Sequence, residues 1–103
     1  MWAQLIKTRL KPGKEDGLER LYQQLRATEQ PGSGLVRSTA MRDQKDPSVV
    51  YMMGVFESEE KARAREQDPR RQEGLQEVRA MMAEMFEGPP EFIDLTVVEE
   101  TTS

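Results

Sequence analysis

The sequence predicts an α+β fold in which strands and helices alternate in the order β-α-β-β-α-β. Two segments carry apolar residues at every third or fourth position, which is the period of an amphipathic helix. Four shorter runs are almost wholly apolar or alternate between apolar and polar residues, as strands do. Clusters of Pro and Gly lie between these segments, and such clusters are typical of turns.

The first strand and the first helix are predicted in the N-terminal third of the chain. Residues 2–10, WAQLIKTRL, have apolar side chains at both even and odd positions in their first half. We therefore expect a central strand that is covered on both faces. A helix is predicted from about Lys14 to Glu29, before Pro31 and the glycines that follow it. Its apolar stripe consists of Leu18, Leu21, Tyr22 and Leu25.

A β-hairpin is predicted in the middle of the chain. Residues 35–42, LVRSTAMR, are polar enough to form an edge strand. Residues 49–57, VVYMMGVFE, are almost wholly apolar and are rich in residues that favour strands. We expect this second run to be a buried central strand, joined to the first by the turn DQKDPS.

The second helical segment and the last strand follow. Ser58 can cap the N-terminus of a helix, and Asp68 with Pro69 indicates a break and a fresh start. Gly88 and the two prolines after it end the helix, and residues 91–99 are predicted to form the fourth strand. The apolar stripe of the restarted helix consists of Leu75, Val78, Met82 and Met85.

The order of elements predicts a ferredoxin-like arrangement, an antiparallel sheet with two helices on one face. The 103 residues suffice for one domain, which we expect to span residues 1–103. The charged run at residues 59–73, EEKARAREQDPRRQE, is most simply the solvent face of a helix.

Charge and hydropathy exclude several functional classes. The net charge of −4 provides no basic field for nucleic acid or for an anionic membrane surface. No apolar run approaches the ~20 residues that a membrane-spanning helix requires. The N-terminus lacks the apolar segment of a secretory signal, so the predicted location is the cytoplasm.

The chain contains no Cys, no His and no Asn. Disulfides, thiolate nucleophiles, Cys-based metal centres and histidine general bases are therefore excluded, and we expect no metal site. Carboxylates, two tyrosines, lysines, arginines and hydroxyl groups remain as candidate catalytic groups.

Three motifs in this order resemble the antibiotic biosynthesis monooxygenase (ABM)-like proteins of the dimeric α/β-barrel superfamily. They are the N-terminal strand that leads into KPGKED, the segment VFESEEKARAREQDPRRQEGLQEV, and FEGPPEF before the last strand. The resemblance covers nearly the whole chain, from Trp2 to Glu99. It implies a homodimer in which two sheets face each other and close a barrel.

The resemblance also implies a function. Better-known members oxidise phenols or quinols with O₂ and need no cofactor, because the substrate anion itself donates the electron. One interpretation is therefore a small-molecule-binding protein that acts as a cofactor-independent monooxygenase on a phenolic or quinol compound. The alternative is a non-catalytic dimeric module that binds ligands or serves in stress responses. The expected partners are a second copy of the chain and a small hydrophobic or aromatic ligand.

The candidate site residues follow from the pocket that such folds form between sheet and helices. Met82, Met85 and Phe86 belong either to the packed core or to a deformable wall for a flat ligand. Tyr51 is either a packing residue of its strand or a catalytic phenol, and Arg37 is either solvated or a clamp for an anion. The further expected lining residues are Gln4, Ile6 and Tyr22.

Overall fold

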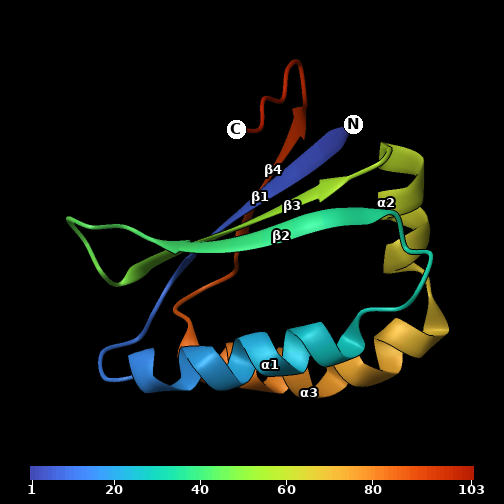
Figure 1. The fold of residues 1–103 in the computed structure, drawn as a ribbon. Helices are drawn as coiled ribbons and strands as arrows, with labels where there is room; N and C mark the ends of the chain where they lie inside the picture. The colour runs from blue at the N-terminus through green and yellow to red at the C-terminus, as the bar shows by residue number, and fades with distance from the viewer.

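The computed structural model describes residues 1–103, and it has the predicted order of strands and helices. A four-stranded antiparallel sheet lies over two long helices that run side by side (Figure 1). A short third helix covers one end of the sheet, as Figure 1 also shows. The strands are β1 (Trp2–Arg9), β2 (Leu35–Arg42), β3 (Val49–Phe56) and β4 (Glu91–Thr96), and the helices are η1 (Glu15–Gly17), α1 (Leu18–Thr28), α2 (Glu59–Glu66) and α3 (Pro69–Met85).

The strand order in the sheet is β2-β3-β1-β4, with every neighbouring pair antiparallel. This order confirms that β1 and β3 are central and that the more polar β2 is an edge strand. Ile6 lies opposite Met52 on β3 and opposite Phe92 on β4. Because successive side chains of a strand point to opposite faces, these three side chains share one face of the sheet.

The second helical segment is broken where the sequence predicts it. The Ser58 hydroxyl accepts a hydrogen bond from the backbone N–H of Lys61 at 3.1 Å and caps α2. Asp68 caps α3 in the same manner, and Pro69 takes the first helical position, where its missing N–H costs nothing. The break allows α2 to cover the end of the sheet while α3 runs beside α1 (Figure 1).

The C-terminal end of α3 differs from the prediction. The helix ends at Met85, three residues before Gly88, and Phe86 adopts an extended conformation. Phe86 forms an isolated antiparallel bridge with Leu10, just beyond the end of β1. Pairing with Leu10 thus ends the helix earlier, and Gly88, with a φ of 66°, forms the turn toward β4. That strand ends at Thr96, before the predicted Glu99.

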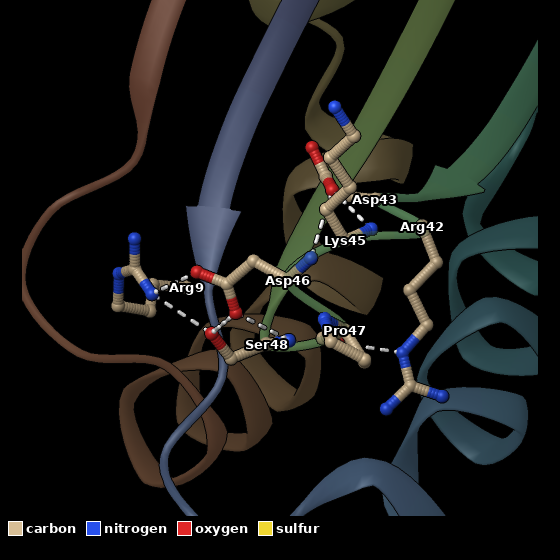
Figure 2. A network of polar contacts seen from close by, with 7 residues as sticks. All are labelled: Arg9, Arg42, Asp43, Lys45, Asp46, Pro47 and Ser48. Carbon is tan, nitrogen blue, oxygen red and sulfur yellow. Dashed lines mark hydrogen bonds and ion pairs between the residues drawn. The ribbon is translucent and has the colours of Figure 1, made fainter.

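The turn between β2 and β3 is held by polar contacts, which Figure 2 shows. Asp43 accepts hydrogen bonds from the backbone N–H groups of Lys45 and Asp46, as aspartates in turns commonly do. Arg9 of β1 donates to Asp46 at 2.9 Å and to Ser48 at 2.8 Å (Figure 2). These contacts anchor the hairpin turn to the central strand.

The packed core is concentrated at two places. The larger cluster joins α1 and α3 to the ends of β1 and β3, and the smaller one joins Trp2, Phe56 and Ala62 of α2. The rings of Trp2 and Phe56 have centroids 5.9 Å apart. The larger cluster consists of Leu10, Leu21, Val50, Leu75, Val78, Met85 and Phe86.

No helix is both long and apolar enough to cross a membrane.

Candidate ligand-binding site

A cavity of about 840 Å³ lies between the sheet and the helices. Its volume is within the range of about 300–1,000 Å³ that is usual for small-molecule sites. More than half of the residues in its wall, 15 of 27, are hydrophobic. The two core clusters therefore leave between them a hollow large enough for a ring compound.

The sheet side of the wall is formed by alternate residues of the central strands. Gln4, Ile6 and Thr8 of β1 lie opposite Gly54, Met52 and Val50 of β3, respectively, and all six line the cavity. Gly54 lacks a side chain where a Cβ atom would lie only 3.0 Å from the ring of Phe56. The glycine therefore keeps this part of the wall open.

The helix side of the wall comes from the predicted apolar stripes. Leu21, Tyr22 and Leu25 of α1 face the cavity, and α3 contributes Leu75, Val78 and Met82. Phe86 closes the wall beyond the end of α3.

Met85 is the exception among the predicted lining residues. It is buried in the larger core cluster and borders a separate, smaller recess of about 330 Å³ instead of the cavity. Met81 and Met85 are the only hydrophobic residues in the wall of that recess. The remaining predicted lining residues, Gln4, Ile6, Tyr22, Met82 and Phe86, all border the large cavity.

Tyr51 and Arg37 do not line this cavity. Tyr51 lies between Val50 and Met52, both of which face the cavity, so strand alternation directs Tyr51 to the opposite face of the sheet. Arg37 pairs with Val55, which lies on that same outer face. The Arg37 guanidinium forms an ion pair with Glu100 of the C-terminal segment.

Two polar side chains of the wall are suited to hold a hydroxyl compound. The Gln4 amide nitrogen donates to Asp94 at 3.0 Å, which leaves the amide oxygen of Gln4 free to accept. Burial raises the pKa of the Tyr22 hydroxyl above its ordinary value, and the charge of Arg42 offsets only part of this effect. Tyr22 is therefore a neutral hydrogen-bond donor at neutral pH.

One end of the cavity is charged, at the point where α1 and α2 end and α3 begins. Arg65 donates to the Glu29 carboxylate through Nη2 at 2.6 Å and through Nε at 3.0 Å. Burial acts to raise the pKa of Glu29, but hydrogen bonds from Arg65 and Ser33 outweigh it and hold the pKa below its ordinary value. Glu29 is thus an ionised partner of Arg65, which makes it a poor general base.

Arg71 lines the same end of the cavity without a partner. Its side chain forms no hydrogen bond or ion pair, and its Nε atom is buried. Burial, together with the charge of Arg65, lowers the pKa of Arg71 below its ordinary value. A guanidinium nevertheless keeps its proton at neutral pH, so Arg71 presents an unpaired positive charge at the cavity.

The charged run at residues 59–73 was predicted to face solvent, and for Arg65, Glu66 and Arg71 this prediction is wrong, because all three line the cavity. The sequence did contain a signal for Arg71. Arg71 precedes Leu75 by four residues, so it extends the stripe formed by Leu75, Val78 and Met82 by one helical turn. No group of three or more Asp or Glu side chains is placed to hold a metal ion.

The fold is shared with solved structures of low sequence identity. A Chloroflexus aurantiacus protein assigned to the ABM proteins is 23% identical, with a TM-score of 0.70, over 99% of this chain and 98% of that one. A Bordetella bronchiseptica protein with the same assignment is 19% identical, with a TM-score of 0.77, over 95% and 97% of the two chains. Rv0793 of Mycobacterium tuberculosis is 14% identical, with a TM-score of 0.74, over 98% of each chain.

No curated protein matches the sequence. The profile of the antibiotic biosynthesis monooxygenase family, in contrast, matches residues 1–77. That range includes β1, β2, β3 and the cavity residues that these three strands contribute. The chain therefore belongs to the antibiotic biosynthesis monooxygenase (ABM) family.

Proposed function

We propose that the chain binds a small aromatic molecule in the cavity between sheet and helices and oxidises it with O₂ as a cofactor-independent monooxygenase. The observation that carries this proposal is the cavity of about 840 Å³ with a mostly hydrophobic wall, in a chain that belongs to the ABM family. A flat phenol or quinol fits such a wall, and Met52 and Met82 can adapt to its shape.

The proposed reaction of a quinol balances without a further reductant. One atom of O₂ replaces a ring hydrogen as a hydroxyl group, and the other leaves as water. The ring supplies the electrons by passing from quinol to quinone, after a quinol hydroxyl has released its proton to water. The protein's contribution is to orient the ring, to exclude bulk water and to hold the oxygens of the substrate.

We assign the contacts to the substrate oxygens to Tyr22 and Gln4. The Tyr22 hydroxyl donates to one oxygen, and the amide oxygen of Gln4 accepts from a hydroxyl group of the substrate. The proposal gives no role in the cavity to Tyr51 and Arg37, because both lie on the outer face of the sheet.

We further propose that the chain works as a homodimer joined through this outer face. Leu5, Met53 and Ile93 form one row across β1, β3 and β4 on that face. Ile93 of this row and Leu95, two residues further along β4, have 37% and 40% of their surface exposed. A second copy of the same face would cover this apolar row.

Oxygen uptake over a panel of hydroquinones tests the enzymatic proposal. We expect Tyr22→Phe to lower kcat/KM by about tenfold, because one hydrogen bond to a charged substrate oxygen is lost. Tyr51→Phe is the matched control, and it should leave kcat/KM unchanged. Equal effects of the two substitutions would contradict the assignment of Tyr22.

The second candidate function is a binding protein without catalysis. The observation that favours it is the absence of a general base among the cavity residues, since the only two acids of the wall, Glu29 and Glu66, both bind arginines. Ligand binding without oxygen uptake on any compound of the panel would establish this alternative.

A further inference from the structure

The wall of the cavity has the opposite charge to the chain as a whole. The chain has a net charge of −4, whereas the wall contains four arginines, two glutamates, no lysine and no aspartate. The wall therefore carries an excess of two positive charges. The four arginines are Arg26 of α1, Arg65 of α2, and Arg71 and Arg79 of α3.

The charges of the two glutamates attract Arg71, but neither glutamate forms an ion pair or a hydrogen bond with it. Glu29 is bound by Arg65, with 2.6 Å between the closest nitrogen and oxygen. Glu66 is bound by Arg63, whose Nη1 lies 3.2 Å from a carboxylate oxygen. Both wall carboxylates thus already have a cationic partner, and Arg71 has none.

Arg26 and Arg79 of the wall have no carboxylate partner either. Arg79 donates only to the neutral side chain of Gln72, at 2.8 Å, and Arg26 forms no side-chain hydrogen bond or ion pair. Both of these side chains are exposed, so water can solvate them. Arg71 differs because its Nε atom is buried and without a partner. An unpaired charge that is partly buried is costly, and a ligand carboxylate that accepts from the Nη groups of this guanidinium would offset that cost.

We propose that the cavity takes an aromatic carboxylate, whose carboxylate group Arg71 binds and whose ring lies against the apolar wall. The inference rests on the proposed binding function of the cavity and adds the chemical class of its ligand. A guanidinium matches a carboxylate with two parallel hydrogen bonds. The ring would extend from Arg71 along the stripe of Leu75, Val78 and Met82, which lines the cavity on the same helix.

The test compares two ligands that share one ring system and differ in whether they carry a carboxylate charge. N-phenyl-1-naphthylamine, an uncharged fluorescent ring compound, reports occupancy of the apolar cavity. It is displaced with 2-naphthoate or with 2-naphthamide, which have the same ring system and differ in the charged group. We expect 2-naphthoate to displace the reporter at a concentration about tenfold lower than 2-naphthamide, as a charge-assisted hydrogen bond predicts.

Arg71→Gln should abolish this advantage of 2-naphthoate and leave binding of the uncharged reporter unchanged, which also shows that the cavity remains intact. Arg70→Gln is the matched control, since it removes the same charge from an adjacent side chain that pairs with Asp68 outside the cavity. Arg71→Lys keeps the charge without the paired geometry and should restore only part of the advantage.

The outcomes distinguish the two proposals. If the reporter binds but 2-naphthoate has no advantage over 2-naphthamide, or keeps its advantage in Arg71→Gln, the carboxylate inference is overturned and the binding function stands. If Arg70→Gln removes the advantage as fully as Arg71→Gln, the effect belongs to the general surface charge, and the inference also fails. If neither the reporter nor either naphthalene compound binds, both proposals fail.

Discussion

Gly74 of α3 lies directly against Thr28 of α1: a Cβ atom on Gly74 would lie 2.8 Å from the methyl carbon of Thr28. Thr28 is buried, with 3% of its surface exposed, and it cannot move aside into solvent. The glycine therefore sets how closely α1 and α3 approach each other at this contact. An alanine elsewhere in a helix would be favoured over glycine by about 1 kcal/mol.

We predict that Gly74→Ala lowers the free energy of unfolding by about 1–3 kcal/mol, because overpacking outweighs the gain in helix propensity. Urea unfolding measures this difference. Gly17→Ala is the control, since its Cβ atom would meet only the flexible end of Met85 at 3.2 Å. An increase in stability for Gly74→Ala would show that the helices can separate easily at this contact.

The ion pair of Glu29 with Arg65 predicts a dependence of stability on pH. The pKa of Glu29 is lower in the folded chain than its ordinary value of about 4.3. The stabilisation is therefore fully present above pH ~4.3 and is lost as the pH falls through the folded pKa. We expect Glu29→Gln to be less stable than the natural chain at pH 7, on the order of 1 kcal/mol.

This difference should shrink as the pH is lowered from 5 to 3, and urea unfolding at several pH values measures it. The pKa of Asp46 is also lowered, by hydrogen bonds from Ser48 and Arg9. The pKa of Asp94 is lowered by hydrogen bonds from Gln4 and Arg63. Both aspartates are present in the natural chain and in Glu29→Gln, so the difference in the free energy of unfolding between these two proteins reports the titration of Glu29. A difference that stays constant with pH would contradict the ion-pair account.

The proposed dimer makes a prediction about two adjacent residues of β4. Ile93→Lys places a charge on the outer face and should dissociate the dimer into monomers, because a buried unpaired charge is costly. Phe92→Lys is the matched control, because Phe92 lines the cavity on the other face. Native mass spectrometry of both variants measures the ratio of dimer to monomer. If Phe92→Lys dissociates the dimer and Ile93→Lys does not, the interface lies on the cavity face of the sheet and the proposal is contradicted.

Gly54 predicts how the cavity responds to a single methyl group. In Gly54→Ala, the new Cβ atom meets the ring of Phe56 at 3.0 Å, so the ring must shift. We expect binding of the uncharged naphthylamine reporter to weaken by a few-fold, since one side of the wall becomes narrower. A fluorescence titration measures it. Unchanged affinity would mean that the ligand does not reach this part of the wall.

Most of the fold could be predicted from local patterns. The cap at Ser58 and the restart at Pro69 depend on backbone chemistry within a few residues, and both were confirmed. The central position of β3 followed from its lack of polar residues, and the sheet order confirmed it. The early end of α3 could not be predicted in this way, because it depends on pairing of Phe86 with Leu10, a residue distant in sequence.

The site was predictable only in part. Tyr22 and Met82 belong to amphipathic helices whose apolar side must face the sheet, so their place in the wall followed from periodicity. Residues of β3 are apolar on both faces, so the pattern could not tell which face meets the helices. Tyr51 was for this reason as good a candidate as Met52. Arg71 was overlooked because the charges around it are typical of a solvent-facing helix.

The alternation of β1 has a consequence for how such a chain can diversify. Gln4 and Ile6 belong to the cavity, while Leu5, between them, belongs to the proposed surface for the second copy. Substitutions at even positions can therefore alter which compound is accepted without touching the assembly, and substitutions at odd positions can do the reverse. Descendants of one ancestral chain can thus acquire new ligands while they retain the same quaternary structure.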